Sequence, residues 1–348
     1  MAFSDKLEAW YNDNGRTLPW RGIDDPYRIW LSEIILQQTR IEQGRDYWLR
    51  FVEAFPAVAD LAAAGEEQVL RLWQGLGYYS RARNLHAAAQ YIMNNCGGRF
   101  PDTYEGLLKL RGVGRYTAAA IASFAYRLPY PVIDGNVYRF VSRLRGISTP
   151  IATDTAYTEF ETLLKTLINP IQPDRFNAAM MDFGSLQCRP QPDCPACPFA
   201  DECVALRTGR VALLPVKAPK AKPTERWFYY FDLRWQGYIA MHLRTERDIW
   251  RGLWELPLME TDHELTDDEL LTEARRFVEN AFRLSIPHFR LSGPYIHQLT
   301  HRTVHALFLQ AETAEPPASW PENTRLILLR ETKNIPVSRL IDKYLKQV

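Results

Sequence analysis

The stretch that decides the fold of the first half of the chain is Leu110-Arg111-Gly112-Val113-Gly114-Arg115-Tyr116-Thr117. Gly112 and Gly114 allow the backbone to turn sharply, and the run of small residues over 117–126 predicts a helix directly after the turn. Amide N–H groups left uncovered at the positive end of that helix suit a phosphate group. A lone Gly-x-Gly is equally typical of an ordinary turn between two helices, so this stretch alone does not fix a function.

Helical patterns surround this turn and later give way to strands. Residues 28–40, 80–94 and 154–168 have the spacing or composition of helices. Residues 211–226 contain three prolines and three lysines without periodicity, which is typical of a linker. Beyond it, 227–243 and 305–311 predict strands, whereas 270–282 and 337–345 predict helices. We therefore expect a mainly α domain over 1–208, a linker over 209–226 and an α+β domain over 227–348.

Length and charge agree with this division. A chain of 348 residues fits two domains. The net charge is only +1, but eight Lys and Arg stand against three Asp and Glu over 99–145, and six against one over 203–226. Such stretches suit phosphate contacts, although a solvated basic surface is the more common explanation. No apolar run is long enough for a membrane span, and charges near the N-terminus argue against a signal peptide, so we expect a cytoplasmic protein.

Four of the five cysteines lie close together in the sequence, as Cys188, Cys194, Cys197 and Cys203. In a reducing compartment such a group indicates a metal centre rather than disulfides. Zinc and a [4Fe–4S] cluster can both take four thiolates. A single Cys-x-x-Cys pair, flanked by single cysteines at longer spacing, favours the cluster. Four nearby prolines predict that the ligands sit on an irregular loop.

An acidic residue follows the glycine turn at a distance of twenty residues, in Val132-Ile133-Asp134-Gly135-Asn136. Taken alone, Asp134 is best explained as the N-cap of a helix over 136–146. Taken together, the glycine turn, this Asp and the closing cysteine loop resemble the helix-hairpin-helix DNA glycosylase superfamily. Further motifs narrow the resemblance to the adenine DNA glycosylase family. They are Leu18-Pro19-Trp20-Arg21, Trp30-Leu31-Ser32-Glu33-Ile34-Ile35-Leu36-Gln37-Gln38-Thr39 and Gly75-Leu76-Gly77-Tyr78-Tyr79-Ser80-Arg81-Ala82-Arg83-Asn84-Leu85.

The resemblance implies a base excision repair enzyme that hydrolyses the N-glycosidic bond of adenine paired with 8-oxoguanine or guanine in duplex DNA. Breaking that bond requires a proton for the purine ring and an anion beside the oxocarbenium-like sugar. Glu33 is the expected acid, because an apolar helix should raise its pKa by desolvation. Asp134, held ionised by a helix N-terminus and Asn136, is the expected anion or nucleophile. Tyr116 stands where strand-cleaving relatives carry a Schiff-base lysine, so we expect the strand to stay intact.

The target base must leave the stack before this chemistry. The resemblance places a set of side chains around the flipped adenine, together with Tyr116: Arg16, Trp20, Leu36 and Asp182. Other residues are expected to fill the duplex or hold its backbone: Gln37, Tyr78, Arg81, Gly112, Val113 and Gly114. A monovalent cation is a candidate ligand at the glycine turn. We further expect a monomer associated with the bacterial nucleoid and without membrane partners.

The second domain resembles a Nudix fold at Gly252-Leu253-Trp254-Glu255-Leu256-Pro257. Leu258 stands where the hydrolytic Nudix motif needs a Glu, and residues 275–279 lack its carboxylate cluster, so a binding module is expected. The segment His297-Gln298-Leu299-Thr300-His301 resembles the family's lesion-reading loop, with Leu and Thr in place of the usual Phe and Ser. Leu299, Thr300 and His301 are therefore expected to contact 8-oxoguanine, although purely structural histidines would also fit.

Two other functions fit part of the sequence. One is an endonuclease III-like glycosylase and lyase for oxidised pyrimidines, which Tyr116 and the extra domain oppose. The other is a non-catalytic iron–sulfur DNA-binding protein, for which Asp134→Asn would change nothing. The gap of five residues between the first two clustered cysteines is also one shorter than is usual in the family.

Overall fold

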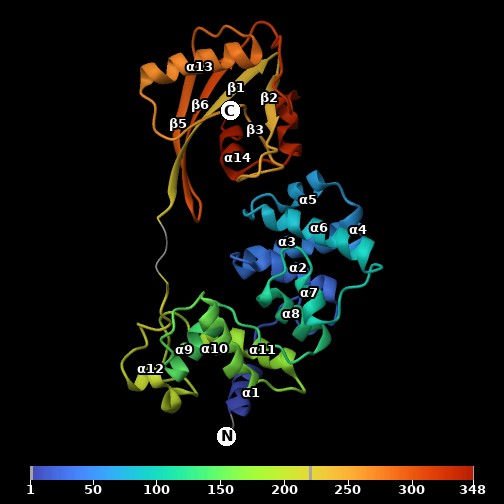
Figure 1. Ribbon diagram of the computed structural model, residues 1–348, viewed down its shortest axis with the longest axis vertical. Helices are drawn as coiled ribbons and strands as arrows, with labels where there is room; N and C mark the ends of the chain where they lie inside the picture. The colour runs from blue at the N-terminus through green and yellow to red at the C-terminus, as the bar shows by residue number, and fades with distance from the viewer. Residues whose placement is uncertain (1–2, 219–221, 348) are drawn as a thin grey trace. The chain divides into compact units, whose positions relative to one another are not determined.

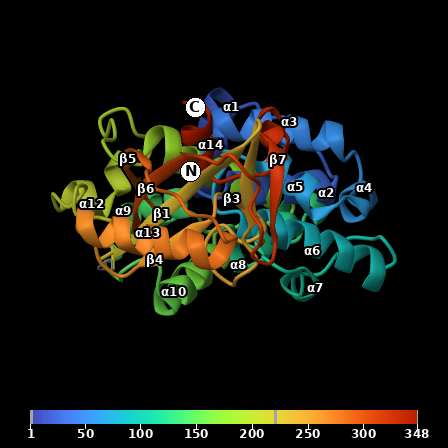
Figure 2. The same cartoon turned by 90° about the horizontal axis from the view of Figure 1, so that it is seen from above.

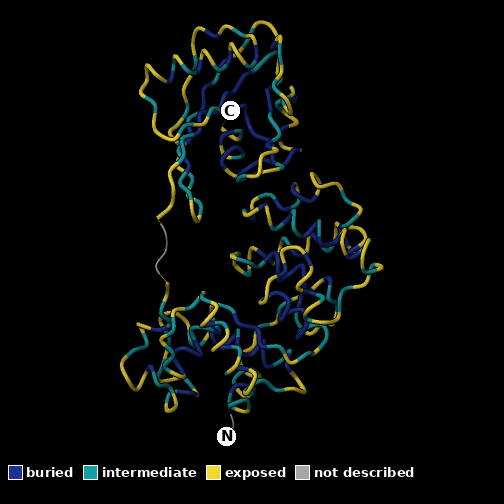
Figure 3. The backbone as a smooth tube through the Cα atoms, viewed as in Figure 1, coloured by how far each residue is buried: buried dark blue, intermediate teal, exposed yellow. Residues whose placement is uncertain are grey.

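The computed structural model describes residues 3–218 and 222–347, which belong to two compact units (Figure 1). The helical unit comprises Met1–Ala63 and Asn84–Pro219, and the sheet unit comprises Ala64–Arg83 and Lys220–Val348. Buried residues are concentrated inside each unit (Figure 3). No helix among the described residues has the length and apolar character needed to cross a membrane.

The first part of the chain is built almost entirely from helices, as the sequence predicts. They are α1 (Phe3–Asn14), α2 (Pro26–Leu36), α3 (Ile41–Ala54), α4 (Val58–Ala63), α5 (Glu66–Trp73), α6 (Ser80–Asn95), α7 (Tyr104–Leu108), α8 (Arg115–Tyr126), α9 (Gly135–Arg145), α10 (Asp154–Lys165), α11 (Pro173–Asp182) and α12 (Val204–Arg207). A π-helical turn, η1 (Phe183–Gln187), follows α11, and a 3₁₀ turn, η2 (Ala200–Glu202), lies in the cysteine loop.

The helix α2 ends earlier than predicted. It begins after Asp25, whose carboxylate accepts hydrogen bonds from the backbone N–H groups of Tyr27 and Arg28, and Pro26 occupies its first turn. It stops at Leu36 rather than at residue 40, because Gln38 takes a left-handed conformation with φ 57° that cannot continue a helix. Residues 37–39 therefore form a turn beside the end of α2.

The glycine turn joins α7 to α8 as a helical hairpin. Gly112 has φ +81°, and a Cβ there would lie 2.8 Å from the Cβ of Asn84, so both its conformation and its surroundings require glycine. Gly114 is the N-cap of α8 and lacks any side chain over the first amides of that helix. Alanine-rich α8 is buried along most of its length and packs against α2. The hairpin is thus fixed to the element that carries Glu33.

The sheet unit is built on a mixed sheet. Its strands are β1 (Thr224–Trp235), β2 (Tyr238–Leu243), β3 (Trp254–Glu255), β4 (Leu258–Thr261), β5 (Arg290–Gln298), β6 (Arg302–Glu312) and β7 (Thr324–Leu328). The order is β3-β2-β1-β6-β5, with β4 paired to β1 and β7 paired to β2, and β1 and β6 run parallel. The helices are α13 (Asp267–Phe282) and α14 (Arg339–Leu345), with the 3₁₀ turn η3 (Leu329–Asn334) between β7 and α14. The apolar face of α13 packs across β1 and β6 (Figure 2).

The predicted strand over 227–243 is two strands. Gln236 and Gly237, both with positive φ, form a two-residue hairpin turn between β1 and β2. The first strand already begins at Thr224, inside the segment 209–226 expected as a linker, because it pairs with β6 from Arg302 onward.

Candidate active site

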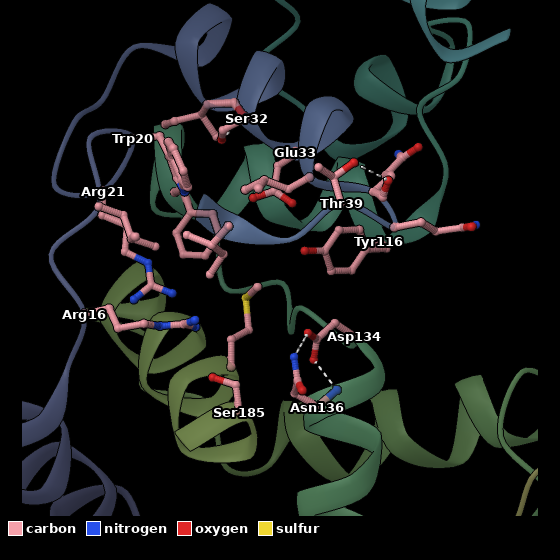
Figure 4. A pocket seen from close by; sticks show the side chains of 18 of the residues that line it. Arg16, Trp20, Arg21, Ser32, Glu33, Thr39, Tyr116, Asp134, Asn136 and Ser185 are labelled. Atoms are coloured by element: carbon pink, nitrogen blue, oxygen red, sulfur yellow. Dashed lines mark hydrogen bonds between the residues drawn. The ribbon is translucent and has the colours of Figure 1, made fainter. Parts of the chain in front are cut away.

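A cavity of about 410 Å³ in the helical unit brings together the residues that the sequence singles out for chemistry (Figure 4). Glu33 enters it from α2, Tyr116 from the first turn of α8, and Asp134 and Asn136 from the start of α9. These segments are far apart in the sequence. The predicted residues that line the cavity are Arg16, Trp20, Glu33, Leu36, Gln37, Tyr116, Asp134 and Asn136.

Glu33 has the protonation behaviour of a general acid. Only 7% of the residue is exposed, and α2 is buried on both sides of it. Burial raises its pKa from 4.5 to about 7, while a hydrogen bond from Tyr116 and the charge of Arg21 act in the opposite direction. A carboxyl group with this pKa keeps a proton in a large fraction of molecules at neutral pH.

Asp134 caps α9, as its sequence context predicts. One carboxylate oxygen accepts the backbone N–H groups of Asn136 (2.9 Å) and Val137 (2.7 Å), and the other accepts the Asn136 side-chain amide at 2.7 Å. These hydrogen bonds favour the charged form, as expected, but burial outweighs them and raises the pKa of Asp134 above its ordinary value. The geometry leaves Asp134 oriented toward the cavity by the start of the helix itself.

Tyr116 lies between the two carboxyl groups. It is partly buried, and its pKa is raised well above 10, first by desolvation and then by the charges of Glu33 and Asp134. It therefore keeps its proton and donates a hydrogen bond to Glu33. No amine occupies this position.

Asp182 does not line the cavity but holds two residues that do. Its fully buried carboxylate accepts hydrogen bonds from the Arg16 Nε at 2.9 Å and from the Arg21 guanidinium at 2.7 and 2.9 Å. These arginines hold the pKa of Asp182 below its ordinary value although burial alone would raise it. Asp182 was expected beside the adenine, whereas the structure places it behind Arg16 and Arg21.

Arg139 links the start of α9 to the cysteine loop. Its guanidinium donates to the Asn136 side-chain oxygen at 2.8 Å and to the backbone carbonyl of Cys188 at 2.7 Å, and it also bonds the carbonyl of Gly184 in η1. Gly184 is in close contact with α9, since a Cβ there would lie 2.5 Å from the carbonyl oxygen of Asn136. Asn136, which orients Asp134, is therefore held on its other side by Arg139 and packed against Gly184.

The four clustered cysteines line one small cavity of about 30 Å³, together with Phe140 and Arg143. The loop is irregular apart from η2, as its prolines predict. Arg143 is buried and donates to the carbonyls of Arg189 (2.8 Å) and Pro190 (3.1 Å), with Cys188 Sγ at 3.6 Å. Over 3–218 and 222–347, no three His, Cys, Asp or Glu side chains are close enough to hold a single metal ion. Four thiols around a shared space fit a group that takes one thiolate at each of four irons.

The residues expected to hold DNA lie in several places. Gly112, Val113 and Gly114 form the helical hairpin, whereas Gln37 lines the cavity. Within the sheet unit, Tyr78 is 45% exposed and its hydroxyl bonds that of Thr300. Arg81 is turned inward, with its guanidinium over the Trp73 ring and toward the carbonyls of the 76–77 loop. Leu299, Thr300 and His301 form the turn between β5 and β6.

Several residues complete the site although the sequence predicts no role for them. Arg21 and Arg139 are the most important: Arg21 itself lines the cavity and is held by Asp182, and Arg139 holds the side-chain amide of Asn136. Arg139 could have been found from its spacing, because it lies one helical turn after Asn136. Other unassigned residues of the cavity lining include Ser32, Thr39, Met181 and Ser185.

Known protein families match both parts of the chain. The profile of the HhH-GPD superfamily base excision DNA repair proteins matches residues 31–169, and that of the NUDIX domain matches residues 229–347. The solved structure of a thermostable thymine-DNA glycosylase superposes with a TM-score of 0.56 at 27% identity, covering 59% of this chain and 95% of that one. An endonuclease III–DNA covalent intermediate, at 23% identity and TM-score 0.52, shares the fold over 59% of this chain and 94% of its own. Fold and site together define a DNA N-glycosylase of the helix-hairpin-helix class, extended by a Nudix domain.

Relatives that match most of this chain identify the family within this class. The adenine DNA glycosylase of Mus musculus is 31% identical over 98% of this chain and 77% of the relative. That of Buchnera aphidicola subsp. Schizaphis graminum is 32% identical over 88% of this chain and 86% of the relative. The chain belongs to the adenine DNA glycosylase family.

Proposed function

We propose that this protein binds duplex DNA and removes adenine mispaired with 8-oxoguanine or guanine, after the target nucleotide has rotated out of the stack into the 410 Å³ cavity. The observation that carries the proposal is the pair of carboxyl groups in that cavity. One has a pKa of about 7, and the other is oriented by the start of a helix. The same cavity offers an aromatic ring, Trp20, and a cation, Arg16, to an adenine base.

The reaction follows from these groups. Glu33 gives its proton to a ring nitrogen of adenine, so that the base leaves with the electron pair of the C1′–N bond. Asp134 balances the positive charge that develops on the sugar, or bonds C1′ for a short time, and water then adds to C1′ while its proton returns to Glu33. Tyr116 cannot form a Schiff base, so the product is an abasic site in an unbroken strand.

The surrounding residues shape the site in this proposal. Arg16, Trp20 and Leu36 contact the adenine, and Asp182 acts on it through the two arginines that it holds. Gln37 and Tyr78 replace the lost base stacking, and Arg81 supports the Tyr78 loop from inside. Gly112, Val113 and Gly114 bind a backbone phosphate, with a monovalent cation as a further ligand.

A [4Fe–4S] cluster is proposed for the cysteine loop. Cys188, Cys194, Cys197 and Cys203 would hold it, because all four thiols line one cavity. Such a cluster supplies four metal–thiolate bonds that fix a loop which has almost no secondary structure of its own. The backbone of Cys188 would in turn fix Arg139 and, through it, Asn136.

The second domain is proposed to read the base opposite adenine. We place the catalytic domain at 1–208 and the recognition domain at 227–348, with 209–226 between them. Leu299, Thr300 and His301 would contact 8-oxoguanine, since their turn is exposed apart from Leu299. We expect a monomer acting on the bacterial nucleoid.

The test is a labelled duplex with one adenine opposite 8-oxoguanine, incubated with protein and then treated with alkali. Cleavage at the adenine is expected for the wild type, and little or none for Glu33→Gln and Asp134→Asn. Glu159→Gln, which changes an exposed carboxylate of α10, is the matched control and should cleave normally. An intact adenine strand with the wild type would reject the proposal, and abundant borohydride-trapped adducts would instead indicate a lyase.

A further inference from the structure

Two loops of the sheet unit meet at one partly buried ionic cluster. The first loop, residues 244–253, connects β2 to β3, and the second is the 299–301 turn between β5 and β6. Asp248 of the first loop lies at the centre of the cluster. Nothing in the proposed reaction uses it.

Asp248 accepts hydrogen bonds from three arginines that come from three strands or their ends. One oxygen receives Arg226 Nη1 at 2.6 Å and Arg244 Nη2 at 2.8 Å. The other oxygen receives Arg302 Nη1. Burial alone would raise the pKa of Asp248, but a hydrogen bond from the backbone N–H of Ile249, together with Arg226 and Arg244, holds it well below its usual range. The carboxylate is therefore held in its charged form.

Two of the three arginines are themselves held by carboxylates of the sheet. Arg226 in β1 bonds Glu260 of β4 at 2.7 Å, and Arg244 bonds the buried Glu255 of β3 at 2.9 Å. These pairs fix the position of Asp248 relative to the sheet. Arg302 has Asp248 as its one carboxylate partner among the described residues, and 37% of its side chain is exposed.

Arg302 closes the turn that carries the expected lesion-contacting residues. Its backbone carbonyl accepts the Leu299 N–H at 2.8 Å, and the carbonyl of His301 accepts the Thr224 N–H at 3.0 Å. A second contact joins the 244–253 loop to the end of β5, directly before the turn, because the Trp250 ring meets the His297 ring edge to face at 5.6 Å. The turn thus depends on the 244–253 loop for its position.

We propose that Asp248 is a positioning residue that fixes the 299–301 turn through Arg302 and thereby sets the preference for 8-oxoguanine over guanine opposite adenine. The inference rests on the proposed reading of that base by Leu299, Thr300 and His301. Asp248 does not contact the DNA in this arrangement. Its effect is on where Thr300 and His301 lie when the opposite base arrives.

The test compares single-turnover adenine removal from two duplexes, one with 8-oxoguanine and one with guanine opposite the adenine. The variants are Arg302→Gln, Arg302→Lys and Asp248→Asn. The matched control is Asp342→Asn, which removes the partner of Lys346 in an ion pair of α14. Asp248→Asn perturbs the fold more, because it removes the anion that three arginines share, whereas Arg302→Gln leaves the pairs of Asp248 with Arg226 and Arg244 intact.

Arg302→Gln is expected to lower the ratio of the two rates by about tenfold, the factor that corresponds to one charge-assisted hydrogen bond. Arg302→Lys should recover part of the ratio, since it keeps a charged donor for Asp248. A double variant of Asp248 and Arg302 should lose no more than the larger single effect. Asp342→Asn should keep the wild-type ratio.

Two results would refute the positioning role of Asp248. A third, measured on the wild type, would show that the proposed reading of 8-oxoguanine is itself wrong. An unchanged ratio in Arg302→Gln refutes it. An equal loss of rate on both duplexes also refutes it if the salt dependence of DNA binding falls by about one ion. That combination is the behaviour of a residue that contacts a DNA phosphate. If the wild type itself does not prefer the 8-oxoguanine duplex, the proposed reading of the lesion fails first, and the positioning role fails with it.

Discussion

Replacing Glu33 by Gln should stabilise the folded protein above pH 7 while it removes the activity. In the folded chain the pKa of Glu33 is about 7, against an ordinary 4.5, because burial disfavours its charge. The unfolded chain therefore loses the Glu33 proton at lower pH than the folded chain does. The stability that this difference contributes is fully present below 4.5 and is lost as the pH rises through about 7.

The magnitude follows from the two pKa values. The interval between 4.5 and about 7, taken at about 1.4 kcal/mol for each pH unit, amounts to about 3 kcal/mol. Gln has the same shape and carries no charge at any pH. Relative to the wild type, Glu33→Gln should therefore gain about 3 kcal/mol of unfolding free energy between pH 4.5 and pH values above 7.

Urea denaturation of both proteins across this pH range measures the effect. Glu159→Gln serves as the control, because its carboxylate is exposed in the folded chain as well as in the unfolded one. Parallel curves for wild type and Glu33→Gln would refute the reasoning, since they would mean that Glu33 is ionised in the folded protein at an ordinary pH. A gain confined to Glu33→Gln would confirm that burial holds the proton on this group.

Three further variants probe the neighbouring groups. Tyr116→Phe removes a hydrogen bond that lowers the pKa of Glu33, so the alkaline limb of the pH–rate profile should move upward by about one pH unit, with Tyr104→Phe as control; a downward movement would contradict this. Asp182→Asn leaves two partly buried arginines without their anion and should cost about 3 kcal/mol of unfolding free energy; a loss below about 1 kcal/mol would show that the cluster is solvated. Cys197→Ser should reduce the iron content of the purified protein and its visible absorbance, whereas Cys96→Ser should not; equal iron in both would reject the cysteine loop as the cluster site.

Local signals in the sequence were sufficient to predict most helices and strands, and to predict Asp134 as the N-cap of a helix. The glycine turn, the Asp134 cap and the irregular cysteine loop all depend on residues within a few positions of one another, and the structure shows each of them. The predicted end of α2 was wrong by four residues. The helix stops before the left-handed Gln38, and no Gly or Pro there marks the break in the sequence. The break at 236–237 was missed although Gly237 is such a marker.

Long-range pairing lay beyond the sequence. Asp182 meets Arg16 and Arg21 across more than a hundred and sixty residues, so no spacing rule could show that it holds them from behind. The parallel pairing of β1 with β6 also joins distant segments. For Asp134 the sequence indicated the hydrogen bonds but not the extent of burial, and burial decides the direction of its pKa.

The contact between Gly184 and the first turn of α9 changes how natural variants should be judged. A methyl group at this position would collide with the backbone of Asn136 rather than with a flexible side chain. Glycine to alanine is ordinarily ranked among the mildest exchanges, and Gly184 lines neither of the two cavities with the assigned residues. In a catalogue of inherited substitutions Gly184→Ala would nevertheless belong with the damaging ones, since it would displace Asn136 and with it the carboxylate of Asp134.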